Sequence, residues 1–298
     1  MYVDGQRSQA EERPELAIVL QPVRGLVRHL PGVTVHRDPY TGPFAAYHRM
    51  VAAGQTWDVD ALLAAAGRCG GPVLDVGCGH GRIALALARA GHPVTAIDTS
   101  APAIAHLRNT VAEDPALTDM IDVVHGDITT PGVVPPGSHA LAVLGNLSVN
   151  MFATPAEATA VLAAMRRAVR PDGLVCFPVL HADALEQFAG MRGMSAVPFV
   201  DDHGRQRLLW FVLDHESAGP HTWRTLFTLD DNASDGSLVG HVAAVRERLW
   251  TQHSLSPSIA AAGLHVVDSH PLSVPAGRGT CPGTLLVTAC RQTLPDGE

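Results

Sequence analysis

The chain has 298 residues, of which 46% are apolar, enough for one large α/β domain with an elaboration or for two small domains. Its net charge of −8 at pH 7 disfavours nucleic acid as the main partner, because phosphate backbones are bound by clustered cations and the chain contains no Lys. Apolar runs end well short of the ~18 residues that cross a bilayer, and five scattered cysteines without a CxxC pair favour reduced thiols over disulfides or a zinc site.

The first part of the chain predicts helices around an extended arm. Its start is acidic, with Asp4, Glu11 and Glu12, and does not resemble a signal peptide, so we expect a cytoplasmic protein without a membrane partner. An apolar stretch at Leu16–Leu30 predicts a short helix beside the arm. Helical spacing of apolar residues between 42 and 66 predicts two further helices before the first core strand.

From residue 72 the chain alternates short apolar runs with helical segments, which is typical of a parallel sheet covered on both faces. The expected strands are Val73–Val76, Val94–Asp98, Ile121–His125, Ala140–Leu144 and Leu174–Val179. The expected helices between them are Arg82–Ala90, Ala101–Val111 and Pro155–Val169. This order predicts an α/β fold with a doubly wound sheet.

After residue 180 the pattern changes. Arg207–Leu213 and Trp223–Leu229 are rich in β-branched and aromatic residues and are separated by a turn signal, which predicts an antiparallel pair. A third strand is expected near Val239–Leu249. Ser256–Ala262 then reads as a helix, and two final strands are expected at His265–Asp268 and Thr284–Ala289.

The segment Val73–Arg82 joins a buried strand directly to a helix through a G-x-G-x-G turn. Glycines allow a tight turn and let a ligand approach the main chain without meeting a Cβ. Arg82 stands where the dinucleotide fingerprint requires its third glycine, so a nicotinamide or flavin dinucleotide is disfavoured.

Two carboxylates flank this turn. Asp75 lies inside the strand, where an ionised group is costly unless it meets a cation or donors, and the ammonium of a methionine moiety would suit it. Asp98 closes the next strand, where its two oxygens can accept hydrogen bonds from both hydroxyls of a ribose. The pair therefore suits a ligand that carries a ribose but no pyrophosphate.

The glycine turn resembles motif I of class I S-adenosylmethionine (SAM)-dependent methyltransferases, and the resemblance covers most of residues 70–180 and the C-terminal strands. It implies a mostly parallel, seven-stranded, Rossmann-like sheet with SAM as cofactor. The cofactor-binding residues that it implies are Asp75, Gly77, Cys78, Gly79 and Gly81 at the methionine portion, Asp98 and Thr99 at the ribose and adenine, Asp127 and Ile128 near the adenine amino group, Gly145 and Asn146 beneath the sulfonium, and Tyr47 over the cofactor.

Several of these residues also have ordinary structural interpretations. Asp127 could be a turn former after a strand, and Asn146 could cap a loop. Tyr47 could be a helix core aromatic, and His48 beside it departs from the Tyr-Asp usual in the family. Cys78 is more typical of a small space-filling residue than of a nucleophile.

The resemblance implies four parts. Residues 1–66 would form an N-terminal arm and helices that cover the cofactor site, and 67–180 the SAM-binding core. Residues 181–250 would form a small antiparallel lid over the substrate, and 251–298 the last helix and strands of the core. Ligands in open α/β sheets lie at the carboxyl ends of the strands, so these covering parts should face substrate.

Methyl transfer needs positioning more than acid–base chemistry, so few residues are expected to be catalytic. The candidates are His181, placed just beyond the fifth strand as a base, with Asn146 and Tyr47. The lid supplies Trp210, His215, Trp223 and Arg224 as candidate substrate-binding residues. Trp210 and His215 point to opposite faces of a strand, so the four cannot all line one pocket.

The insertion resembles that of sugar-amine N-methyltransferases and other natural-product tailoring enzymes. The runs Gly145–Phe152 and Arg246–Thr251 also resemble the methyltransferases of daptide-type ribosomal peptide pathways. The resemblance implies methylation, including N,N-dimethylation, of a small-molecule or peptide amine. Hydroxyl methylation and a SAM-binding, non-catalytic partner protein stay open as alternatives, as does a homodimer. We expect no metal, because the sequence contains no H-x-x-x-H or comparable pair on a helix. We expect no nucleic acid substrate, because the segment after the fourth strand lacks the motif used on flipped bases.

Overall fold

The computed structural model describes residues 21–30, 32–185, 193–216, 219–231, 236–272 and 283–291. The chain divides into two compact units, with boundaries after His48, after Phe188 and after Arg246. One unit combines the middle insertion with the N-terminal segment, and the other contains residues 49–188 and the C-terminal part. Each unit is described by itself below.

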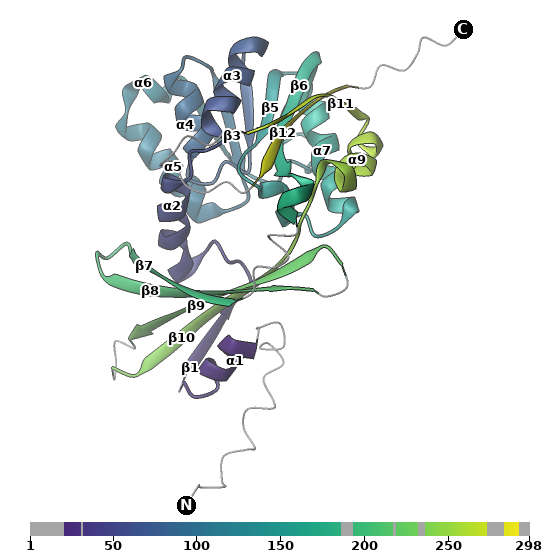
Figure 1. The fold of residues 1–298 in the computed structure, drawn as a ribbon. Helices are drawn as coiled ribbons and strands as arrows, with labels where there is room; N and C mark the ends of the chain where they lie inside the picture. The colour runs from purple at the N-terminus through teal and green to yellow at the C-terminus, as the bar shows by residue number, and fades with distance from the viewer. Residues whose placement is uncertain are drawn as a thin grey trace, which may run out of the picture. The chain divides into compact units, whose positions relative to one another are not determined.

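The larger unit is built on a seven-stranded sheet (Figure 1). In sheet order its strands are β11 (Leu264–Pro271), β12 (Thr284–Arg291), β6 (Val169–Leu180), β5 (His139–Leu144), β2 (Val73–Val76), β3 (Val94–Asp98) and β4 (Ile121–His125). The strands β4, β3, β2, β5 and β6 pair in parallel, whereas β12 runs antiparallel to both its neighbours. This is the class I methyltransferase fold, which confirms the predicted α/β, mostly parallel seven-stranded sheet.

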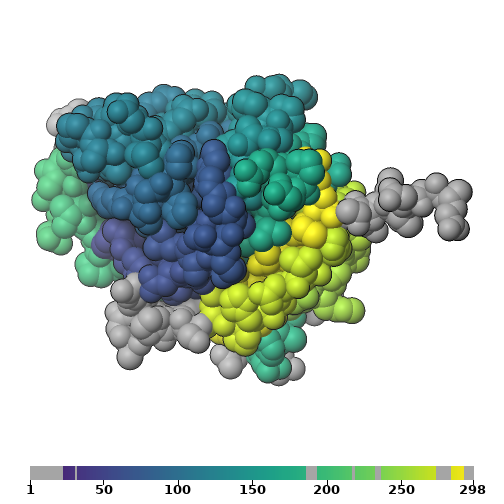
Figure 2. All heavy atoms as spheres, turned by 90° about the horizontal axis from the view of Figure 1, so that it is seen from above, coloured from purple at the N-terminus to yellow at the C-terminus, as the bar shows by residue number. Residues whose placement is uncertain are grey.

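Helices cover both faces of this sheet. They are α3 (Val59–Cys69), α4 (Arg82–Arg89), α5 (Ala101–Glu113), α6 (Pro115–Thr118), α7 (Pro155–Ala168) and α9 (Gln252–Ala261), with the short 3-10 turn η3 (Ser148–Met151) after β5. One apolar cluster joins α3, α4 and α5 to the sheet, and a second joins α7 and α9 to it. Figure 2 shows the blue segments gathered on one side of this unit, with the teal segment of α7 and the yellow-green segment of α9 on the other.

The period-2 alternation of the buried strands divides their side chains between these clusters. In β2, Leu74 and Val76 belong to the cluster under α7 and α9, whereas Val73 belongs to the cluster under α3, α4 and α5. Asp75 therefore points to the face covered by α4, because it shares the side of Val73. The sheet register alone carries this carboxyl group into an apolar layer.

The helix expected at Ser256–Ala262 begins earlier, at Gln252. Thr251 and Ser254 form a capping box, in which the Thr251 hydroxyl accepts from the Ser254 amide at 3.2 Å. A capping box satisfies amide groups that the first helical turn leaves free. The strand expected at Leu174–Val179 also begins earlier, at Val169, and the short helix α6 was not expected. The other predicted core elements lie within a few residues of their expected ends.

The smaller unit is a five-stranded sheet with strand order β1 (Gly32–His36), β10 (Leu238–Arg248), β9 (His221–Asp231), β8 (Gln206–His215) and β7 (Gly193–Val200). The expected antiparallel pair is β8 and β9, and the expected third strand is β10. Two strands were not expected: β7, and β1, which pairs in parallel with β10. The same unit contains α1 (Gln21–Val27), the turn η2 (Gly42–Phe44) and the first residues of α2 (Ala45–Gly54).

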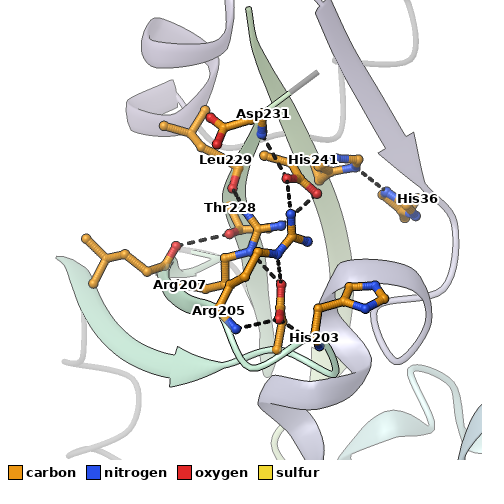
Figure 3. A network of polar contacts seen from close by, with 11 residues as sticks. His36, His203, Arg205, Arg207, Thr228, Leu229, Asp231 and His241 are labelled. Atoms are coloured by element: carbon orange, nitrogen blue, oxygen red, sulfur yellow. Dashed lines mark hydrogen bonds and ion pairs between the residues drawn. The ribbon is translucent and has the colours of Figure 1, made fainter. Parts of the chain in front are cut away.

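A polar network lies on the smaller sheet (Figure 3). Arg207 on β8 is only 13% exposed and contacts Asp201 at 3.0 Å and Asp230 at 2.6 Å, and it donates to the Leu229 carbonyl at 2.9 Å. Arg205 pairs with the same Asp201 from a more exposed position. The network joins β8, the end of β9 and the turn before β8.

Across the described helices, none combines the length and hydropathy needed to span a bilayer.

Candidate functional site

The glycine turn has the geometry of a ligand cradle. Gly77, Gly79 and Gly81 have φ values of 64°, 54° and 88°, all in the left-handed region that other residues rarely adopt. A Cβ placed on Gly79 would meet no atom within 4 Å, so this position borders open space. The turn closes through the Gly81 amide, which donates to the Cys78 carbonyl at 2.9 Å, and α4 begins at the next residue.

Asp75 contributes a buried carboxyl group beneath the turn. It is 1% exposed, and its Oδ2 accepts from the Ala84 amide at 3.0 Å in the first turn of α4. Its Oδ1 has no hydrogen-bond partner among the described residues. Burial raises the pKa of Asp75 to about 7, against the opposing effects of Arg82 and the Ala84 amide. An orphaned buried oxygen at this place fits a bound cationic group.

Asp98 ties the glycine turn to the end of β3. Its Oδ2 accepts from the Gly79 amide at 2.7 Å, and its Oδ1 accepts from the Ser100 amide at 2.8 Å. Each carboxylate oxygen has a second lone pair, so the ribose hydroxyls proposed as ligands can still be accommodated. Thr99 next to it is exposed, and its carbonyl lies 3.1 Å from the His125 Nε2.

Two predicted cofactor residues after β4 have local roles in the structure. The exposed Asp127 accepts at one oxygen from both the amide and the hydroxyl of Thr129, at 2.8 and 2.7 Å, which is an Asx turn. Ile128 is 8% exposed and packs in the core. Cys78 is 7% exposed, and burial raises the pKa of its thiol well above the usual range, which is unsuited to a nucleophile. The cofactor contacts of all three stay predictions.

Sequence reasoning missed the group that joins the glycine turn to the end of β5. Asp58 is fully buried, and both its oxygens bind the Arg82 guanidinium, at 2.9 Å for Nη2. Asp58 also accepts from the Asn146 amide at 2.5 Å. The sequence offers no signal for this contact, because Asp58 precedes a helix and looks like an ordinary N-cap residue.

Gly145 and Asn146 therefore lie directly against the ion pair. A Cβ on Gly145 would overlap the Ile83 side chain and come within 3.3 Å of the Asp58 carboxylate. Asn146 has φ 56°, the sole positive value for a residue other than glycine in the described parts of the chain, and its side chain donates to Gln55 at 2.8 Å. The segment predicted beneath the sulfonium thus has a tightly specified backbone.

The other two catalytic candidates lie in different units. His181 follows β6, its side chain is 42% exposed, and its Nδ1 accepts from the Asp183 amide at 3.2 Å. Tyr47 is 8% exposed and packs against the rings of His48 and Phe199 in the smaller unit. Burial raises the pKa of Tyr47, although Arg224 opposes the rise. Their roles in catalysis stay predictions.

The four substrate-binding candidates divide between the two faces of the smaller sheet. Asp214 pairs with Trp223 across the β8–β9 ladder and Trp210 with Phe227, so both tryptophans share one face. His215 and Arg224 lie on the other face, because their positions alternate with those residues. The predicted separation of Trp210 from His215 is therefore confirmed, and at most two of the four can line one pocket.

Residues 73–173 match a family model described as a methyltransferase domain. The match begins with β2 and ends in β6, so it contains the glycine turn and the segment at Asn146. Residues 73–173 form a methyltransferase domain. This confirms the methyltransferase assignment that the sequence predicted from motif I.

One curated protein and two solved structures illustrate the similarity of this methyltransferase domain. The mitochondrial ubiquinone biosynthesis O-methyltransferase of Schizosaccharomyces pombe is 37% identical over 59 residues, and the match spans 20% of this chain and 22% of that protein. The glycopeptide N-methyltransferase MtfA, solved with SAM, aligns with a TM-score of 0.57 at 18% identity, over 91% of this chain and 98% of that one.

The second solved structure is SAM-bound CalS10 of Micromonospora echinaspora, described as an amino pentose methyltransferase of calicheamicin biosynthesis. It aligns with a TM-score of 0.56 at 21% identity, over 85% of this chain and 99% of that one. At these identities the likeness concerns the fold. Both solved relatives contain the cofactor that the sequence predicts for this chain.

Proposed function

We propose that this chain is a SAM-dependent methyltransferase that methylates an amine of a small molecule or peptide in natural-product biosynthesis, with N,N-dimethylation of one nitrogen as its product. The observation that carries the proposal is the glycine turn of the methyltransferase domain. It combines three left-handed glycines, open space at Gly79 and the orphaned Oδ1 of Asp75. These features fit the adenosyl and methionine portions of SAM.

SAM, when bound, would supply a methyl group on a sulfonium; attack on that methyl in line with the C–S bond would release S-adenosylhomocysteine as a neutral thioether, so the leaving group would need no acid. The chain's own residues hold the donor and the acceptor in line and exclude water. In the proposed complex, Asp98 and the turn glycines would hold the donor, and the Asp75 carboxyl group would accept its ammonium group. Gly145 and Asn146 set the floor of the site at the carboxyl end of β5, where ligands of open α/β sheets bind.

An amine acceptor must lose its proton before it can attack, because a free alkylammonium has a pKa of about 10. His181 is the candidate base, since it follows β6 and is partly exposed. Support for an amine comes from the descriptions of MtfA as an N-methyltransferase and of CalS10 as acting on an amino pentose. The fungal relative, an O-methyltransferase, keeps a hydroxyl acceptor as the second candidate.

The decisive experiment incubates the pure chain with SAM and a panel of amino sugars and peptides with free amines. We expect S-adenosylhomocysteine to form and acceptor masses to rise by one or two methyl groups. A matched panel with hydroxyls in place of the amines separates the two candidates, since only nitrogen takes two methyls at one atom. Tight cofactor binding without turnover on either panel would instead indicate a non-catalytic SAM-binding protein.

Asp98→Ala tests the ribose assignment independently of the acceptor. The change removes charged acceptors worth about 1.5–3 kcal/mol, so S-adenosylhomocysteine affinity in calorimetry should fall about 10- to 150-fold. Asp122→Ala, an exposed carboxylate on the neighbouring strand β4, is the matched control and should bind normally. Unchanged affinity in Asp98→Ala would contradict the assignment.

A further inference from the structure

The hydrogen bonds of the Asp58 carboxylate all go to residues outside its own helix. Asp58 occupies the N-cap position of α3, yet it makes no side-chain hydrogen bond to that helix. Its oxygens accept instead from both terminal nitrogens of Arg82 and from the Asn146 amide. An N-cap aspartate usually accepts a hydrogen bond from the first turn of its own helix. Asp58 instead links two other segments of the chain.

The contacts connect the two loops that leave neighbouring strands at the same level. Val76 and Leu144 are paired in the β2–β5 ladder, and the next residues are Gly77 and Gly145. Arg82 follows the first loop and Asn146 belongs to the second. The buried carboxylate is therefore a clamp that fixes the spacing between the glycine turn and the end of β5.

The clamp also holds a backbone conformation that an unrestrained chain would not favour. Asn146 has φ 56°, in the left-handed region that residues other than glycine seldom adopt, although asparagine tolerates it better than most. Two contacts keep it there: its amide donates to Asp58, and its side chain donates to the Gln55 side chain at 2.8 Å. Gly145 has no space for a side chain beside Asp58 and Arg82, so the backbone is pressed against the ion pair.

We propose that Asp58 is a positioning residue for methyl transfer, which acts by clamping Arg82 to the Asn146 amide and so setting the Gly145–Asn146 backbone. The inference rests on the proposed function. Its consequence is specific: the clamp controls how the donor methyl is aligned rather than how tightly the cofactor is held, because Asp75, Asp98 and the turn glycines supply the binding contacts. Misplacement of about 1 Å in a reacting pair can lower the rate about 100-fold.

The test measures affinity and alignment separately in Asp58→Asn. The amide has the same shape and can still accept from the Asn146 amide, but it loses the charge that holds Arg82. We expect S-adenosylhomocysteine affinity within about threefold of the wild type and kcat lowered about 10- to 100-fold. Asp60→Asn, an exposed residue in the first turn of the same helix, is the matched control and should keep both values.

A readout that needs no acceptor is the resonance of the donor methyl in bound [methyl-13C]SAM. The Asp58→Asn complex should show a shifted or broadened methyl resonance at unchanged affinity. Failure of the wild type to bind this probe would contradict the proposed function itself. Wild-type binding, with an identical resonance and an identical kcat in Asp58→Asn, would overturn the positioning role alone.

A loss of affinity as large as the loss of kcat would also overturn the role, because Asp58 would then act through cofactor binding. If Asp58→Asn does not fold, Arg82→Lys carries the test, since its ammonium keeps the charge but cannot bind both Asp58 oxygens in the forked geometry of a guanidinium. It should lower kcat about 3- to 10-fold with normal cofactor affinity. Normal kcat and an unshifted methyl resonance in this variant would refute the clamp.

Discussion

Asp75 is the carboxyl group whose ionisation the fold alters most clearly among the described residues of the larger unit. It lies 1% exposed on β2, it accepts one backbone hydrogen bond, and burial raises its pKa to about 7 from an ordinary value of 3.8. Below about pH 7 the buried Asp75 is therefore largely protonated, and the neutral carboxyl group needs no cation beside it. A bound ammonium group would favour the ionised form instead, because an opposite charge nearby lowers a carboxyl pKa.

This shift predicts that the ligand-free protein loses stability as the pH rises from about 4 to 7. In that window the folded state keeps a proton that the unfolded state has released, so the free energy of unfolding falls with pH and levels off above 7. Asp75→Asn should remove this part of the pH dependence, measured as Tm against pH. Binding of SAM near pH 6.5 should release a proton, detected by calorimetry in buffers of different ionisation enthalpy. Equal profiles for both proteins would contradict the assignment.

The contact between α4 and α5 depends on the last glycine of the turn. Gly81 caps α4 with φ 88°, and a Cβ there would overlap the Leu107 side chain of α5. The glycine therefore has two functions: it adopts a left-handed conformation, and it allows the helices to approach. Gly79 differs, because a Cβ there would meet only open space.

Gly91 separates these two functions, since it has φ 89° after α4 and a Cβ there would meet no atom within 4 Å. Gly91→Ala should cost about 1–2 kcal/mol of unfolding free energy from backbone strain. Gly81→Ala should cost about 1–3 kcal/mol more, because it adds overpacking against Leu107. Urea unfolding measures both values. In a Leu107→Ala background the two alanine penalties should become equal, and a persisting difference would contradict the packing argument.

At the scale of the whole molecule, the glycine turn and the polar network of Figure 3 belong to different compact units. The glycine turn, Asp98 and the Asp58 clamp lie in the larger unit. Arg207, with Asp201 and Asp230, stabilises the smaller sheet. Although burial opposes it, hydrogen bonds from the Arg205 amide and the Arg207 side chain lower the pKa of Asp201, so the network is formed at neutral pH.

Arg207→Ala should therefore loosen the smaller sheet selectively. Amide exchange within β8 and β9 should become roughly tenfold faster, because two carboxylates lose their shared partner. Affinity for S-adenosylhomocysteine should stay within about threefold of the wild type. Arg205→Ala, which removes a 49% exposed cation from the same network, is the matched control and should change exchange less. A large loss of cofactor affinity in Arg207→Ala would contradict this separation of roles.

Local sequence signals were enough to predict most elements and the glycine turn of the larger unit. The strand Val73–Val76, the glycine turn and the helix at Arg82 are local signals, because a glycine pattern after a buried apolar run specifies its own geometry. The alternation of strands and helices then leaves few topologies for a parallel sheet. Asp75 and Asp98 could be proposed as ligand-binding residues for the same reason, since one lies in the strand before the turn and the other ends the next strand.

Contacts between segments distant in sequence depend on tertiary packing, and the sequence did not predict them. Asp58 meets Arg82 and Asn146 through burial and sheet register, and its sequence environment is that of an ordinary helix start. Likewise β1 pairs in parallel with β10, although about 200 residues separate the two strands in the sequence. A short strand with weak alternation of apolar and polar residues does not indicate its partner. Hydrophobic periodicity reports which face of an element is buried, whereas the partner of that face is set by the packing of the whole chain.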